Sequence, residues 1–291
     1  MKLTEVAAPD FDLAMTLDSG QVFHWEKIEH GFCGAIGDRP VYAEQCGDSL
    51  RATKGCADLV RNYFALDHPL AKICASFPND ALMQAARTYC RGLRIIRQPR
   101  WECLGTFICS SMKQVAHIRQ ISHALRWRFG EQRKIDKYEL YSFPSAERIA
   151  GRSEKDLREC ALGHRAKNLL ATAELVSSGE ANLEAWAALS DVDLRGKLCA
   201  LPGVGAKVAN CVMLFAYERL RAFPIDVWIE RVLREKYFPR ARKLTGRRLR
   251  AFSQTYFGEH GGYAQQYLFH HARHTNRPEC KRGRNLSVPR R

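Results

Sequence analysis

The pattern of apolar and polar residues divides the chain into a strand-rich beginning and a helical remainder. Up to about residue 65, apolar and polar residues alternate in short pieces that glycine or aspartate separates. Alternation of this kind between turn residues is typical of antiparallel strands. The pieces that predict strands are residues 21–25, 31–36 and 40–43. We therefore expect an antiparallel meander at the start of the chain.

Beyond about residue 67 the apolar positions recur at helical spacing, and serine, asparagine, aspartate or proline precedes several of the runs. The predicted fold class is α+β, an antiparallel sheet followed by a mostly helical part. The expected domains are 1–75 (β), 76–277 (helical) and 278–291 (a basic flexible tail). The expected helices are 79–90, 101–111, 113–129, 166–177, 183–189, 191–199, 206–217, 226–237, 244–260 and 264–273, with two more beginning near 145 and 153.

The net charge of the chain indicates what kind of partner it binds. The 291 residues include 46 Lys and Arg against 31 Asp and Glu, a formal net charge of +15. Such an excess favours a polyanion, which leaves DNA, RNA or an acidic membrane surface as candidates. An ordinary basic protein without such a partner is the alternative that charge alone leaves open.

The cysteines indicate a reducing compartment. There are eleven, an odd number, and no two have C-x-x-C spacing. Cys280 is alone in the last eighty residues, which argues against a zinc ribbon or a C-terminal iron–sulfur cluster. The first residues do not resemble a signal peptide, and no apolar run is long enough to span a bilayer. We expect a cytoplasmic (bacterial) or nuclear protein that is not secreted and has no membrane partner.

One glycine hairpin carries the most specific chemistry. Leu201-Pro202-Gly203-Val204-Gly205 lies between two predicted helices, and Lys207 follows in the first turn of the second. Such a turn directs unpaired N–H groups at an anion, so residues 203–205 are predicted to bind a DNA phosphate. The alternative is an ordinary turn between helices that uses glycine for capping.

Lys207 and Asp226 are candidates for catalysis. A lysine in a helix's first turn lies against an unfavourable dipole, which weakens its hold on the proton, and a neutral amine can form a Schiff base. A cationic lysine that contacts phosphate is the equally weighted alternative. Asp226 follows Pro224 and is a preferred N-cap residue for the helix after it. A carboxylate held rigidly in this way could also stabilise an oxocarbenium-like sugar cation.

These residues resemble the helix-hairpin-helix, Gly/Pro-Asp superfamily of DNA glycosylases, and within it the 8-oxoguanine DNA glycosylase/AP lyase family. The resemblance covers nearly the whole chain and implies a TBP-like N-terminal sheet before the glycosylase domain. The segments that carry it, in order, are 18–25, 92–98, 102–111, 162–166, 201–211, 223–227 and 262–269.

The resemblance implies a role for each matching residue. Lys207 would be the Schiff-base nucleophile and Asp226 its partner. The carbonyl of Gly20 would accept the N7 hydrogen that oxidised guanine has and guanine lacks. Gln265 would bind the Watson–Crick edge, while Cys211 and Phe269 would hold the flipped base between them. Packing in the core is the commoner role of such apolar positions, and Gly20 could serve only as a turn. The resemblance also places Arg165 on the DNA backbone.

Four residues depart from the family pattern, and the first three concern the strand opposite the lesion. Met112 stands where eukaryotic members have an asparagine, and it cannot read a base edge, so strictness for cytosine is in doubt. His117 replaces an arginine and His164 a tyrosine wedge, although His164 can still stack into DNA. Trp228 stands where a phosphate-binding histidine is frequent.

The sequence therefore predicts a monomeric repair enzyme that excises 8-oxo-7,8-dihydroguanine from damaged duplex DNA and then cleaves the strand by β-elimination. A monofunctional glycosylase for alkylated bases, with the same fold, is one alternative, although it has no need for Lys207. A non-catalytic DNA-binding hairpin protein is the other. We expect no cofactor and no metal site, except for a possible monovalent or divalent cation at the hairpin carbonyls.

Overall fold

The computed structural model of the protein describes residues 1–111, 113–241 and 243–275. The strands are β1 (Leu3–Ala7), β2 (Glu26–Ile28), β3 (Gly31–Ile36), β4 (Arg39–Cys46), β5 (Ser49–Thr53), β6 (Gln132–Ile135) and β7 (Tyr138–Tyr141). The α-helices are α1 (Leu13–Asp18), α2 (Ala57–Tyr63), α3 (Leu70–Ala75), α4 (Ala81–Tyr89), α5 (Arg100–Cys109), α6 (Val115–Phe129), α7 (Ala146–Ala150), α8 (Glu154–Leu157), α9 (Arg165–Ser177), α10 (Asp191–Cys199), α11 (Ala206–Ala216), α12 (Val227–Val232), α13 (Gly246–Tyr256) and α14 (Gly261–Thr275). The other helical segments are π-helical at Arg158–Leu162 and Leu233–Tyr237 and 3₁₀ at Ala185–Ala188 and Gly258–His260.

Five strands form one antiparallel sheet in the order β1-β5-β4-β3-β2, which confirms the predicted N-terminal β structure. The strand expected over 31–36 coincides with β3, and the one over 40–43 lies within β4. The strand expected over 21–25 is wrong, because these residues run between α1 and β2 outside the sheet. Val22 and Phe23 are buried there, so their apolar character reflects packing against other elements and not a position in the sheet.

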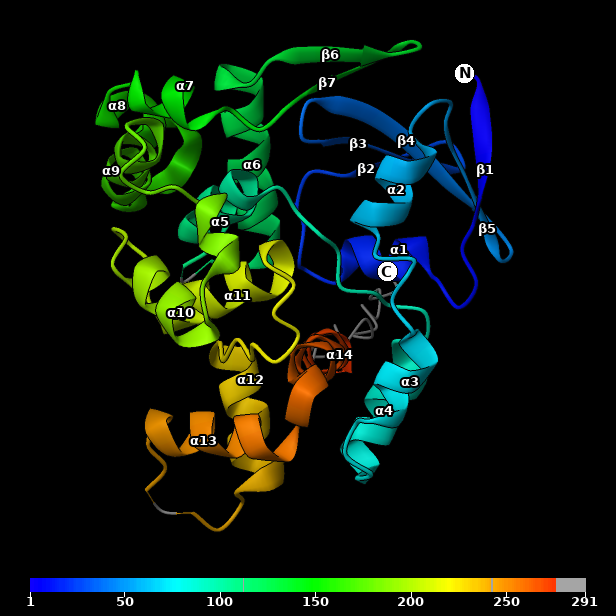
Figure 1. Cartoon of the computed structure of the whole chain (residues 1–291), viewed down its shortest axis with the longest axis vertical. Helices are drawn as coiled ribbons and strands as arrows, with labels where there is room; N and C mark the ends of the chain where they lie inside the picture. The colour runs from blue at the N-terminus through cyan, green and yellow to red at the C-terminus, as the bar shows by residue number, and fades with distance from the viewer. Residues whose placement is uncertain (112, 242, 276–291) are drawn as a thin grey trace, which may run out of the picture.

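Two apolar cores lie on either side of this irregular segment. One joins the sheet to α1 and α2 and includes Leu50, Val60 and Phe64. The other fills the helical part and includes Phe107 and Leu214. Figure 1 shows the sheet with α2 on one side of the molecule, and α14 near the centre between α12 and the pair α3–α4. Helix α14 therefore lies where the sheet domain and the helical domain meet.

The helices follow the sequence pattern closely. Asp80 and Ser190 accept hydrogen bonds from backbone N–H groups three residues later, which confirms the predicted starts of α4 and α10. The runs expected at 101–111 and 113–129 are the separate helices α5 and α6. None of the helices that the structure describes is both long enough and apolar enough to cross a membrane.

Several short elements were not predicted, namely β1, β2, β5, α1, α2, α3 and the hairpin β6–β7. The hairpin strand β6 reads Gln-Arg-Lys-Ile, so it lacks the apolar alternation by which strands are recognised. It is held by tertiary packing, since Ile135 contacts Cys33 and Tyr42 of the sheet. The domain boundary near residue 75 stays a prediction, and the expected basic tail from residue 278 lies outside the described residues.

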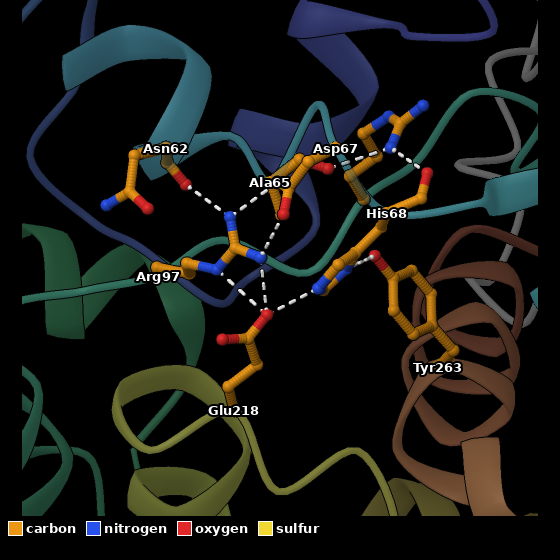
Figure 2. Close-up of polar contacts among 8 residues, drawn as sticks. Asn62, Ala65, Asp67, His68, Arg97, Glu218 and Tyr263 are labelled. Atoms are coloured by element: carbon orange, nitrogen blue, oxygen red, sulfur yellow. Dashed lines mark hydrogen bonds and ion pairs between the residues drawn. The ribbon is translucent and has the colours of Figure 1, made fainter. Parts of the chain in front are cut away.

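A polar network ties four distant segments together near the N-terminal end of α14 (Figure 2). Arg97 binds both oxygens of the Asp67 carboxylate, at 2.6 and 2.8 Å, and donates to Glu218 just after α11. His68 contacts Glu218 with one ring nitrogen and the Tyr263 hydroxyl with the other. Hydrogen bonding from His68 and Arg97 lowers the pKa of Glu218 to about 2. The carboxylate is therefore ionised at neutral pH and fixes the end of α11 relative to α14.

A buried ion pair also joins segments that are far apart in the sequence. Glu102 of α5 and Arg126 of α6 form a salt bridge, and both side chains are almost fully buried. His24 approaches the same carboxylate at 3.3 Å, and its second ring nitrogen contacts the Ala35 carbonyl at 2.7 Å. Burial raises the pKa of Glu102, an effect that the Arg126 charge opposes. The group joins the segment before β2 to the two helices.

Replacement of Arg126 by methionine should destabilise the protein by about 3 kcal/mol or more, because Glu102 would be left as a buried, unpaired charge. The double variant Glu102→Met/Arg126→Met should recover most of that loss, since neither charge then remains. Urea unfolding of the two variants and the parent chain measures both effects. An Arg126→Met variant as stable as the parent would show that the ion pair does not stabilise the packing of α5 and α6.

Candidate active site

The glycine hairpin lies between α10 and α11 as predicted. Gly203 has φ +77° and packs so closely on α9 that an ideal Cβ would lie 2.7 Å from Asn168 Cβ. The Thr172 hydroxyl of the same helix donates to the Pro202 carbonyl at 3.1 Å, and Val204 is buried in the helical core. Gly205 is the N-cap of α11 and offers no side-chain cap. The first N–H groups of α11 are therefore left without a side-chain partner at an exposed turn, as phosphate binding requires.

Lys207 points toward the body of the protein. Its side chain is half-buried, and Nζ donates to the Ser110 hydroxyl at 3.2 Å. The same nitrogen lies 5.1 Å from the centre of the Phe107 ring. Ser110 ends α5 and donates its hydroxyl hydrogen to the Phe107 carbonyl, which leaves its oxygen free to accept from the amine. The amine is thus held at a defined place beside a buried aromatic ring.

Asp226 is the N-cap of α12, as the residue preference predicts. Its Oδ1 accepts from the Ile229 N–H at 2.9 Å. Burial raises the pKa of this carboxyl, while the hydrogen bond from Ile229 and the charge of Lys207 oppose the rise. The amine and the carboxyl therefore interact electrostatically across the site. A capped carboxylate cannot rotate away, so its negative charge has a fixed direction.

Of the predicted base-binding residues, Gln265 and Phe269 lie on α14, Gly20 packs against Phe269, and Cys211 lies on α11. An ideal Cβ on Gly20, whose φ is +84°, would lie 3.0 Å from the Phe269 ring. Gln265 is 4% exposed, and its Oε1 has no hydrogen-bond partner among the described residues. Cys211 is buried one turn beyond Lys207, and burial raises the pKa of its thiol to about 11, which keeps it neutral. The Phe269 ring and the neutral Cys211 thiol can pack against a flat heterocycle. The unpaired Oε1 of Gln265 can accept a hydrogen bond from its polar edge.

The residues expected to face the opposite strand are more dispersed. His117 on α6 and His164 before α9 are both exposed, as contacts with DNA would need. Met112 lies outside the described residues. Arg165 is only 6% exposed, and its guanidinium donates to the carbonyls of Ser111 and Leu162. Its observed role is to hold the chain after α5, and its contact with the DNA backbone stays a prediction.

One group of potential metal ligands lies beside the base-binding residues. Ligand atoms of Asp18, His270 and His274 lie within 4.8 Å of one another. The Asp18 carboxylate, however, already forms ion pairs with Arg119 and Arg273. A divalent cation would have to enter between two arginines, so the group is better described as an ion-paired cluster. Burial lowers the pKa of His270 to about 4, which keeps that ring neutral at physiological pH.

Comparison with known proteins agrees with this arrangement. Residues 106–255, which contain the hairpin, Lys207 and Asp226, match the HhH-GPD superfamily of base excision DNA repair proteins. The chain belongs to this superfamily. Residues 4–104 of this HhH-GPD protein, which include Gly20, match the N-terminal domain of 8-oxoguanine DNA glycosylase.

Relatives of this HhH-GPD protein cover almost its entire length. The N-glycosylase/DNA lyase OGG1 of Arabidopsis thaliana is 30% identical over 293 residues, which is 92% of this chain and 78% of that protein. A solved structure of MBOgg1 with a low-affinity DNA ligand is 32% identical with a TM-score of 0.89, covering 95% of this chain and all of that one. The 8-oxoguanine glycosylase/lyase of Clostridium acetobutylicum, with duplex DNA containing cytosine opposite 8-oxoguanine, is 28% identical with a TM-score of 0.87, covering 95% and 99%.

Sequence reasoning missed the residues that surround the predicted groups in this HhH-GPD site. Ser110 and Phe107 hold the lysine amine, and Gln266 and Arg273 contact the segment that ends at Gly20. A usable signal existed for the last two, because they share a face of the final predicted helix with Phe269. No spacing rule would have linked residue 110 to residue 207.

The two hairpin glycines should respond differently to alanine. Gly203→Ala should cost about 1–3 kcal/mol of stability and weaken DNA binding, because a side chain there is strained and strikes Asn168. Gly205→Ala is the matched control, since nothing lies within 4 Å of its ideal Cβ and its φ is negative, and it should stay within about 0.5 kcal/mol. Thermal unfolding and fluorescence anisotropy with duplex DNA measure both. Equal stability of the two variants would contradict the described packing.

Proposed function

We propose that the chain is a bifunctional DNA repair glycosylase that removes 8-oxo-7,8-dihydroguanine from duplex DNA and cleaves the resulting site. The observation that carries this proposal is the half-buried Lys207 amine, which the Ser110 hydroxyl holds and whose charge acts on the buried carboxyl of Asp226. Support comes from the DNA-bound relatives and from a family match on both halves of the chain. Duplex DNA is accordingly the partner.

The reaction would start with the damaged nucleotide rotated out of the helix, at a cost of roughly a few kcal/mol. The hairpin N–H groups would hold a backbone phosphate while the base enters the pocket. After the Lys207 ammonium gives up a proton to solvent, its lone pair would attack C1′. The electron pair of the C1′–N9 bond would leave with the base, which takes up a proton. The carboxylate of Asp226 would stabilise the positive charge that develops on the sugar.

The strand break would follow from the covalent intermediate. Loss of a proton from the nitrogen and opening of the sugar ring give an imine between Lys207 and C1′. The imine makes the C2′ hydrogen acidic, so its loss to solvent expels the 3′ phosphate by β-elimination. Hydrolysis of the imine returns the free amine. The proposed chemistry uses side chains of one chain only, so a monomer suffices and no cofactor is needed.

The pocket would select the oxidised base through one hydrogen. The Gly20 carbonyl can accept a hydrogen bond from N7–H, whereas N7 of guanine carries a lone pair that would face the carbonyl oxygen. A missing or repulsive contact of this kind is worth about 1–3 kcal/mol. The substrate would place the enzyme with chromosomal DNA, in a bacterial cytoplasm or a nucleus.

Lys207→Gln should abolish strand cleavage of a duplex with one 8-oxoguanine and should prevent borohydride trapping of a protein–DNA adduct. The substitution removes the nucleophile, and Lys155→Gln on exposed α8 is a matched control that should trap normally. Denaturing gels measure both products. Base release by the variant without trapping would favour the monofunctional alternative. No reaction by the parent chain would favour the non-catalytic one.

The base opposite the lesion should matter little. Met112 has no group that can pair with a base edge, and a good side-chain–base pair is worth about 1–3 kcal/mol of discrimination. We expect single-turnover excision opposite adenine, guanine or thymine to stay within about ten-fold of that opposite cytosine. A preference of about 100-fold or more for cytosine would show that His117, His164 or another group reads the opposite base.

A further inference from the structure

Among the residues that the structure describes, the carbonyl of Gly20 has no hydrogen-bond donor, whereas the carbonyls of its neighbours each have one. Asp18 carbonyl accepts from Arg273 Nη2, Ser19 carbonyl from Gln266 Nε2 at 2.7 Å, and Gln21 carbonyl from Gln98 Nε2 at 2.7 Å. Within the part of the chain that the structure describes, no group donates to the carbonyl oxygen of Gly20. An acceptor left open in a well-bonded segment is available for a ligand.

The donors on the protein side are fixed groups. Gln266 is 2% exposed and Arg273 is 9% exposed, and both lie on α14. The Arg273 guanidinium also contacts the Asp18 carboxylate, which Arg119 of α6 holds from the other side at 2.7 Å. Its Cζ lies 5.7 Å from the centre of the Phe269 ring. Two side chains of one helix thus hold the backbone of residues 18–20.

The bonds to the neighbouring carbonyls limit how the Gly20 carbonyl can turn, although they are not made to that carbonyl itself. Each peptide group is planar, so a hydrogen bond to its carbonyl fixes the orientation of that plane. Gln266 fixes the peptide plane before the Gly20–Gln21 peptide, Arg273 fixes the plane before that one, and Gln98 fixes the plane after it. Glycine itself would allow that peptide to rotate at little cost, because it has no Cβ to restrict φ and ψ. The neighbouring bonds therefore supply the rigidity that the glycine lacks.

We propose that Gln266 and Arg273 are positioning residues that aim the Gly20 carbonyl at N7–H of the oxidised base, an inference that rests on the proposed function. The same helix carries Gln265 and Phe269, which are predicted to bind the base. Helix α14 would therefore position the base and also orient the Gly20 carbonyl, which distinguishes oxidised guanine from guanine.

Abasic DNA provides the test, because it needs Lys207 and Asp226 but has no base for Gly20 to read. In Gln266→Met the donor is lost at nearly constant size, so single-turnover excision of 8-oxoguanine should fall about 10-fold. Cleavage of a preformed abasic site by the same variant should stay within about two-fold of the parent rate. Gln84→Met, on exposed α4, is the matched control and should change neither rate.

A second variant guards against a folding defect. Gln266→Glu keeps the shape but places an acceptor against the Ser19 carbonyl, so it should show the same split with a larger loss of excision. Equal losses on both substrates, or no loss on either, would overturn the inference. Failure of the parent chain to cleave the 8-oxoguanine duplex would instead refute the proposed function, so the two failures are distinguishable.

Discussion

The structure depends on how the protein satisfies a buried backbone segment that belongs to neither helix nor sheet. Residues 19–23 cross the junction between the two cores, where Ser19, Gln21, Val22 and Phe23 are buried and their backbone polar groups need partners within the protein. Three buried glutamines supply the missing partners. Gln21 donates to the Arg94 carbonyl and accepts from the Ile96 N–H, while Gln98 and Gln266 donate to the segment itself. The sheet, the chain before α5 and the final helix are thereby joined at one place.

That junction is also where recognition and chemistry meet. Helix α11 carries Lys207 and Cys211, and Asp226 caps α12. Helix α14 carries Gln265 and places Phe269 against Gly20. The Arg97–Glu218–His68 network joins the end of α11 to α14, and the Glu102–Arg126 pair joins α5 to α6. The buried charges of Glu102 and Arg126 are paired with each other. The Gly20 carbonyl and Gln265 Oε1, in contrast, have no partner among the described residues and are available to a ligand.

Much of this could be predicted from the sequence because the decisive signals are local. A glycine pair before a lysine, an aspartate at a helix start and regular apolar spacing each depend on a few consecutive residues. They gave the helices, the cap of α12 and the hairpin. Segments whose structure depends on contacts with distant parts of the chain could not be predicted. Strand β6 has no apolar alternation, and residues 21–25 are largely apolar but do not form a strand. The side-chain partners of Lys207 and of the Ser19 carbonyl lie 97 and 247 residues away, so no spacing connects them.

The central claim is that the pocket reads N7–H through a carbonyl whose direction the protein fixes. A crystal structure of Lys207→Gln bound to a duplex with one 8-oxoguanine tests it most directly. The account predicts the flipped base between Cys211 and Phe269, with the Gly20 oxygen about 2.7–3.2 Å from N7. A base seated in the pocket with that oxygen turned away, or a base bound elsewhere, would contradict it.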